Sequence, residues 1–152
     1  MTHTLVLDTN VVLDLLVFHD PEVATIERAL SNMTAVCVTD AECRAELTRV
    51  LAYPRFALDE SAQREALAAF DRLACHAPEL DAPTLARIPR CTDPDDQKFL
   101  ELAYRCGADM IVTKDRALLD LARATSTHFR IVGPAAAAAL LAAAENRADE
   151  EP

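Results

Sequence analysis

The chain has 152 residues, 51% of them hydrophobic, and 25 Asp or Glu against 15 Lys or Arg give it a formal net charge of −10. This content suffices for the core of one domain, the acidic balance argues against a broad basic surface for nucleic acid, and no apolar run approaches the roughly 20 residues that cross a bilayer. We expect one domain over residues 1–145, followed by a flexible acidic tail at 146–152, and no association with membranes.

The cysteines and the first residues indicate where the protein works. Five cysteines, at positions 37, 43, 75, 91 and 106, show no C-x-x-C spacing, which disfavours a zinc site or a disulfide framework. The start, "MTHTLVLDTN", has no basic region and Asp8 interrupts its apolar run, so it is not typical of a signal peptide. We expect a cytoplasmic protein.

The first half of the chain alternates strand-like and helix-like runs. "HTLVLDT" (3–9) predicts a buried strand that delivers Asp8 at its end, and "AVCVT" (35–39) predicts a second strand. Amphipathic or capped segments predict helices at 11–18, 21–31, 40–53 and 59–74.

The second half continues the alternation. Residues 75–90 carry three prolines, which predicts a loop with room for one short edge strand. A helix is expected from Asp93 to Gly107, then a strand at 108–113, a helix at 115–125, a strand at 128–133 and an alanine-rich closing helix. With two glycines in the chain and no hairpin signal, this order predicts an α/β fold of three layers, α/β/α, with a mainly parallel sheet flanked by helices.

The stretch "CTDPDDQKFLELA" (91–103) holds three aspartates within four positions. Asp93 suits a helix N-cap and Pro94 the first helical position. Asp95 and Asp96 then lie near the positive end of the helix dipole. Helical periodicity does not choose which of these two faces the interior.

Carboxylates also follow the other predicted strands. Asp8 ends the first strand, Glu46 lies in the helix after the second, and Asp115 follows the strand at 108–113. In open α/β sheets, sites form at the carboxyl ends of strands. Carboxylates gathered there repel one another unless a hard cation such as Mg²⁺ or Mn²⁺ binds, and such ions can activate water against a phosphodiester.

Each acid also has a local explanation. Asp8 could be a turn residue, Asp115 a helix N-cap, and Glu46 a partner of Arg49 one helical turn away, in a pair worth roughly 0.2–0.5 kcal/mol. The residues alone leave these alternatives open.

Four blocks of the sequence resemble a known family. "LVLDTNVVL" (5–13), "AELTRVLAYPRF" (45–56), "DPDDQKFLELA" (93–103) and "MIVTKDRALL" (110–119) are similar, in order and spacing, to the signature blocks of PIN-domain proteins. Within that family they resemble the bacterial toxin components of toxin–antitoxin pairs, the VapC-like ribonucleases.

The resemblance implies roles for individual residues. The metal-binding, catalytic acids would be Asp8, Glu46, Asp96 and Asp115. The supporting residues would be Thr9, Asn10, Asp93, Thr113 and Lys114. Among these, Thr9 and Asn10 would support Asp8, Thr113 would orient Asp115 or a water, and the lysine would touch a phosphate or face water.

The resemblance therefore implies a Mg²⁺- or Mn²⁺-dependent endoribonuclease that acts on RNA, forms a homodimer and binds a cognate antitoxin protein. Two alternatives come from other classes. One is an aspartate-based phosphatase or phosphotransfer module, which would need a nucleophilic aspartate and a functional Lys114. The other is a non-catalytic interaction domain whose acids are vestigial, against which the complete set of four acids argues.

Overall fold

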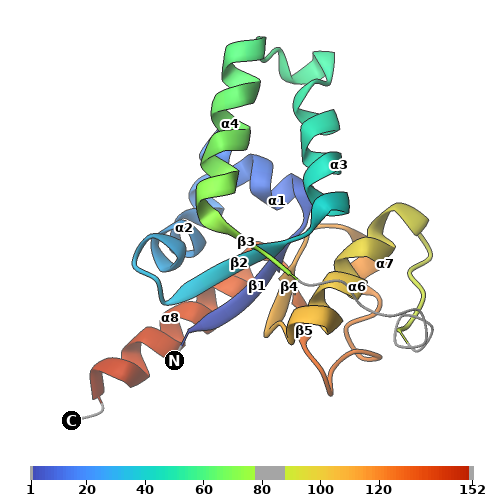
Figure 1. Cartoon of the computed structure of the whole chain (residues 1–152). Coiled ribbons are helices and arrows are strands. Elements are labelled where there is room, and N and C mark those ends of the chain that lie inside the picture. Colours follow the sequence, from blue (N-terminus) through green and yellow to red (C-terminus); the bar gives the residue numbers. More distant parts are fainter. Residues whose placement is uncertain (1, 78–87, 151–152) are drawn as a thin grey trace.

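A central parallel sheet organises the protein (Figure 1). The structure, a computed structural model, describes residues 2–77 and 88–150. In these ranges one five-stranded sheet has the order β3-β2-β1-β4-β5, and every neighbouring pair is parallel. The strands are β1 (His3–Leu7), β2 (Ala35–Thr39), β3 (Ala74–His76), β4 (Met110–Val112) and β5 (Arg130–Val132). The predicted α/β class with a parallel sheet between helices is confirmed.

Helices cover both faces of the sheet, because β1 is apolar on both. Leu5 and Leu7 join one buried cluster and Val6 joins the other, as expected when successive side chains of a strand point to opposite faces. The helices are α1 (Thr9–Leu13), α2 (Ala24–Ser31), α3 (Ala41–Leu51), α4 (Glu60–Leu73), α6 (Gln97–Cys106), α7 (Arg116–Leu119) and α8 (Pro134–Glu150). Residues of α1, α2, α4 and α8 pack in the first cluster, and residues of α6 and α7 pack in the second.

Several predicted boundaries differ from the observed ones. The first helix begins at Thr9, directly after Asp8, and its second half is a π-helical turn, Asp14–Phe18. The helix expected at 115–125 is only α7, and turns occupy the chain from there to His128. The predicted edge strand is β3, which begins inside the range expected for a helix.

The C-terminal segment also differs. Helix α8 continues through the acidic residues to Glu150, so position 145 is not the end of regular structure, and a domain boundary there stays a prediction. Gly107 ends α6 in the left-handed conformation, with φ of 58°, as a C-terminal glycine does. No helix in the described ranges is long and apolar enough to cross a membrane.

A buried ion pair holds α3 and α6 together beside the carboxyl edge of the sheet. Asp40 caps α3 by accepting from the Cys43 backbone N–H at 2.8 Å, and it also accepts from the Arg105 guanidinium of α6. Both side chains of this pair are less than a tenth exposed. Burial alone would raise the pKa of Asp40, but hydrogen bonds from Cys43 and Arg105 hold that pKa below its ordinary value.

We expect Asp40→Ala to lower the free energy of unfolding by more than the roughly 1 kcal/mol of a lost N-cap, because it also removes a carboxylate that contacts the buried Arg105 guanidinium. Asp59 is the matched control, since it caps α4 in the same way, through the Ala62 backbone N–H at 2.7 Å, but is exposed. Asp59→Ala should cost about 1 kcal/mol. Urea unfolding of the two variants measures the difference, and equal losses would contradict a special role for the ion pair.

Candidate metal centre

Two neighbouring strands bring Asp8 and Thr113 together at the carboxyl edge of the sheet. β1 ends just before Asp8 and β4 just before Thr113, and the Asp8 backbone N–H donates to the Val112 carbonyl at 3.0 Å. The Thr113 hydroxyl donates to Asp8 Oδ2 at 2.7 Å. Both side chains are buried. In this strand order the chain runs to β2 on one side of β1 and to β4 on the other, so the pair lies where ligands bind in open α/β sheets.

Thr113 also fixes Asp115, which starts α7. Its hydroxyl oxygen accepts from the Asp115 backbone N–H at 2.9 Å. Asp115 Oδ1 in turn accepts from the Ala117 backbone N–H at 2.9 Å, so Asp115 is an N-cap, as the local explanation held. An N-cap uses only part of a carboxylate's capacity to accept hydrogen bonds, so Asp115 can cap the helix and belong to a site.

The stretch after Cys91 delivers two further acids. Residues Pro94–Asp96 form a 3₁₀ turn, and α6 begins only at Gln97. Asp93 caps this turn by accepting from the Asp95 backbone N–H at 3.0 Å. Helical periodicity left open which of Asp95 and Asp96 faces the interior. In the structure Asp95 is exposed, whereas Asp96 is 7% exposed.

Three of these acids form a compact group. One carboxylate oxygen each from Asp93, Asp96 and Asp115 lies within 4.8 Å of the others. Asp96 Oδ2 is buried and has no hydrogen-bond partner among the described residues. A buried polar atom without a partner is costly, and a divalent cation bound between these oxygens would remove that cost. A donor set of carboxylate oxygens suits Mg²⁺ or Mn²⁺.

Electrostatics link this group to Asp8. The pKa of Asp96 is raised to about 8, first by burial, then by the neighbouring Asp115 carboxyl and by the negative charges of Asp8 and Asp93. Burial also raises the pKa of Asp8, which the charges of Glu46 and Asp115 reinforce and the Thr113 hydroxyl opposes. The four aspartates and Glu46 therefore share one electrostatic environment.

Glu46 reaches this environment from α3 and has its own partners. Its Oε1 lies 3.0 Å from Lys98 Nζ on α6, and the Thr9 hydroxyl donates to its Oε2. The structure thus pairs Glu46 with Lys98 instead of the Arg49 that the sequence offered. Neither Glu46 nor Asp8 is part of the three-carboxylate group, which therefore contains two of the four predicted metal-binding acids.

The supporting residues are placed as follows. The Thr9 hydroxyl goes to Glu46 and not to Asp8, where the sequence placed it, because α1 starts at Thr9 and packs against α3. The Asn10 side chain is exposed, but its backbone N–H is one of the groups that hold the pKa of Asp8 down.

Lys114 has a partner outside the acid group. Its Nζ lies 2.5 Å from Asp14 Oδ2, in the π-helical turn, and its side chain is 44% exposed. The predicted contact with a phosphate therefore competes with an existing ion pair.

Sequence reasoning gave no specific role to Lys98 or Asp14. Lys98 stands four residues before the buried Leu102, which places it on the apolar face of its helix. Asp14 is a single acid within the apolar run "VVLDLLVF". In both cases a charge at a buried helix position was the available signal, since such charges are almost always paired.

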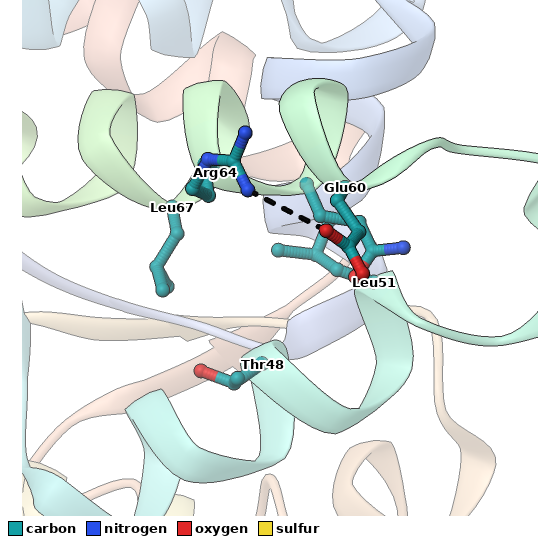
Figure 2. Close-up of a pocket in the computed structure, with 6 residues that line it drawn as sticks. Thr48, Leu51, Glu60, Arg64 and Leu67 are labelled. Atoms are coloured by element: carbon teal, nitrogen blue, oxygen red, sulfur yellow. Dashed lines mark ion pairs between the residues drawn. The ribbon is translucent and has the colours of Figure 1, made fainter.

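A separate hollow lies away from these acids. Figure 2 shows it between α3 and α4, with Arg64 paired to Glu60 at 3.8 Å on its wall. Its volume is about 190 Å³, and it is lined by Thr48, Leu51, Glu60, Gln63, Arg64 and Leu67. A second hollow of about 340 Å³ lies next to the turn that carries Asp96, and both cations (Arg90, Lys98) and acids (Glu42, Glu101) line it.

Comparison with known proteins bears on this site. The family model described as "PIN domain" matches residues 4–117, a span that contains Asp8, Glu46, Asp96 and Asp115. A search of curated proteins finds no significant match.

The acid group predicts how stability depends on pH. Asp96 keeps its proton in the folded state up to about pH 8, whereas in the unfolded chain it loses that proton near pH 4. We therefore expect the unfolding free energy of the metal-free protein to fall as pH rises from about 4 to about 8. Asp96→Asn should flatten this fall, and urea unfolding across that range measures it.

The control for this measurement is Asp120→Asn, since Asp120 is an exposed acid next to α7. It should keep the slope of the unchanged protein. Adding Mn²⁺ at pH 8 should stabilise the unchanged protein more than the Asp96→Asn variant. A slope that Asp96→Asn leaves intact would show that this carboxyl is not the protonated group.

Proposed function

The chain belongs to the PIN-domain family, and from that premise we propose that it is a metal-dependent endoribonuclease that hydrolyses RNA phosphodiester bonds. PIN domains are generally nucleases, act on nucleic acids and typically use divalent metals. The observation that carries the proposal is the unpartnered, buried oxygen of Asp96 within a group of three carboxylates. RNA is favoured over DNA by the resemblance of the signature blocks to VapC-like ribonucleases.

The proposal gives the acids and Thr113 different roles. Asp8, Asp96 and Asp115 would hold Mg²⁺ or Mn²⁺, with Asp93 beside them and Glu46 as the fourth acid of the predicted set. When bound, the ion would supply an activated water and would stabilise the oxygen that leaves phosphorus. The Thr113 hydroxyl orients Asp8, through the 2.7 Å hydrogen bond to its Oδ2.

The adjoining hollow offers positive charge to a substrate. Arg90 is exposed on its wall, whereas Lys98, also in the lining, is buried and paired with Glu46. The Arg90 guanidinium would attract the phosphate of a short stretch of RNA locally, although the net charge of the chain is −10. Binding would therefore be local and would depend on the ion among the acids.

The phosphotransfer alternative is less well supported. It would need a lysine that faces the reacting aspartate, and the sequence offered Lys114 for this role. The Lys114 ammonium is instead paired with Asp14. If the protein were a non-catalytic interaction domain, no bound ion would offset the free-energy cost of burying this group of acids.

We further propose that the protein is the toxin component of a toxin–antitoxin pair, that it is a homodimer, and that it works in the cytoplasm. The resemblance of the four blocks supports the first two statements. The third is supported by the five cysteines, all within the described ranges and all free, since proteins of reducing compartments rarely carry disulfides. A cognate antitoxin would then cover the acids or place a cation among them.

Metal-dependent cleavage is the direct test of the nuclease proposal. We expect the protein to cleave labelled single-stranded RNA with Mn²⁺ or Mg²⁺ and to lose this activity with a chelator. Asp8→Asn, Asp96→Asn and Asp115→Asn should each lower the rate at least about 100-fold, because even residues that only support a metal's ligands cost up to that much. Asp120→Asn is the control. Cleavage that survives in the aspartate variants would belong to a contaminant and would end the proposal.

Expression in a bacterial host tests the toxin role separately. Induction of the unchanged chain should stop colony formation, whereas Asp96→Asn, produced in equal amount, should not. Colony counts and immunoblots measure the two quantities. Normal growth despite active, metal-dependent cleavage in vitro would refute the toxin role and leave the nuclease standing.

A further inference from the structure

Lys98 is a buried cation among the acids. Its side chain is 6% exposed, although its ammonium belongs to one of the most strongly hydrated side chains. Nζ lies 3.0 Å from Glu46 Oε1, donates to the Asp95 backbone carbonyl, and lies 5.0 Å from the centre of the Phe99 ring. These contacts fix the positive charge at one place, between α3 and the turn that carries Asp96.

Glu46 is correspondingly satisfied. One of its oxygens accepts from Lys98, and the other accepts from the Thr9 hydroxyl. The acids of the site therefore fall into two classes. Glu46 already has a cation and a hydroxyl, whereas the group of Asp93, Asp96 and Asp115 has an oxygen without a partner.

A second divalent ion next to Glu46 would have to displace this arrangement. It would lie close to an ammonium that is held by a carboxylate, a carbonyl and an aromatic ring. Like charges at such a distance in a partly buried site repel strongly. The group around Asp96 has no such obstacle, because no cation contacts it among the described residues.

We propose that Lys98 takes the place of a second divalent ion beside Glu46, so that the site binds one ion, among Asp8, Asp96 and Asp115. Glu46 is then the residue that positions Lys98, and not a metal ligand. This differs from the role that the resemblance implied for Glu46. The inference rests on the proposed function only for the presence of one ion among the aspartates.

The stoichiometry of Mn²⁺ binding tests this inference, measured by isothermal titration calorimetry on the purified chain without RNA. The unchanged chain should bind one ion with high affinity. Glu46→Gln should also bind one, with affinity within about threefold, whereas Asp96→Asn should lose it. Lys98→Met should bind two ions, because the freed Glu46 carboxylate can now act as a ligand, and the double variant Lys98→Met, Glu46→Gln should return to one.

Other outcomes distinguish failure of this inference from failure of the proposed function. Two high-affinity ions in the unchanged chain, or loss of the ion in Glu46→Gln, would overturn the role of Lys98 while leaving a metal site in place. A single ion in folded Lys98→Met would also overturn it. No binding to the unchanged chain would instead refute the proposed metal-dependent function. Circular dichroism checks the fold of each variant, and if Lys98→Met does not fold, the Glu46→Gln titration decides alone.

Discussion

Repulsion between carboxylates at the carboxyl edge of β1 and β4 is the constraint to which the rest of the site responds. Asp8 and Asp96 are both buried, and the charge of Asp8 raises the pKa of Asp96. Several local contacts reduce this repulsion. Thr113 donates to Asp8, the Ala117 backbone N–H donates to Asp115, and Lys98 contacts Glu46. These contacts leave one oxygen of Asp96 without a partner, and we place the cation there.

The framework around the acids holds them at this spacing against their repulsion. β1 and β4 pair in parallel, with Leu7 opposite Val112, so the residues that follow the two strands meet at the same level of the sheet. On the other side, the buried pair of Asp40 and Arg105 ties α3 to α6. Glu46 and Lys98, which these two helices carry, form an ion pair at 3.0 Å. The repulsion among the acids is unfavourable, and the packing of the sheet and helices offsets it.

The balance of charge also explains how an acidic protein can act on a polyanion. The chain does not need a wide basic surface if the binding energy for phosphate comes from an ion held by aspartates and from a few cations at its border. Arg90 is such a cation in the lining of the adjoining hollow. Under the proposed function, the metal would be part of the substrate-binding surface as well as of the chemistry.

Much of the architecture could be predicted from the sequence, because it depends on local patterns. The apolar run before Asp8, the acids at strand ends and the left-handed Gly107 all follow from periodicity, helix capping and backbone sterics. The partners of the charged residues could not be predicted in this way. Thr113 and Asp8 are 105 positions apart and Lys98 and Glu46 are 52 apart, so only packing decides that they meet. The choice of Asp96 over Asp95 likewise depended on a 3₁₀ turn, whose three residues per turn rotate the side chains differently from an α-helix. The sequence by itself determined which acids stand at the ends of strands; the tertiary structure decided which of them already have a cation, because charge pairing acts through space and not along the chain.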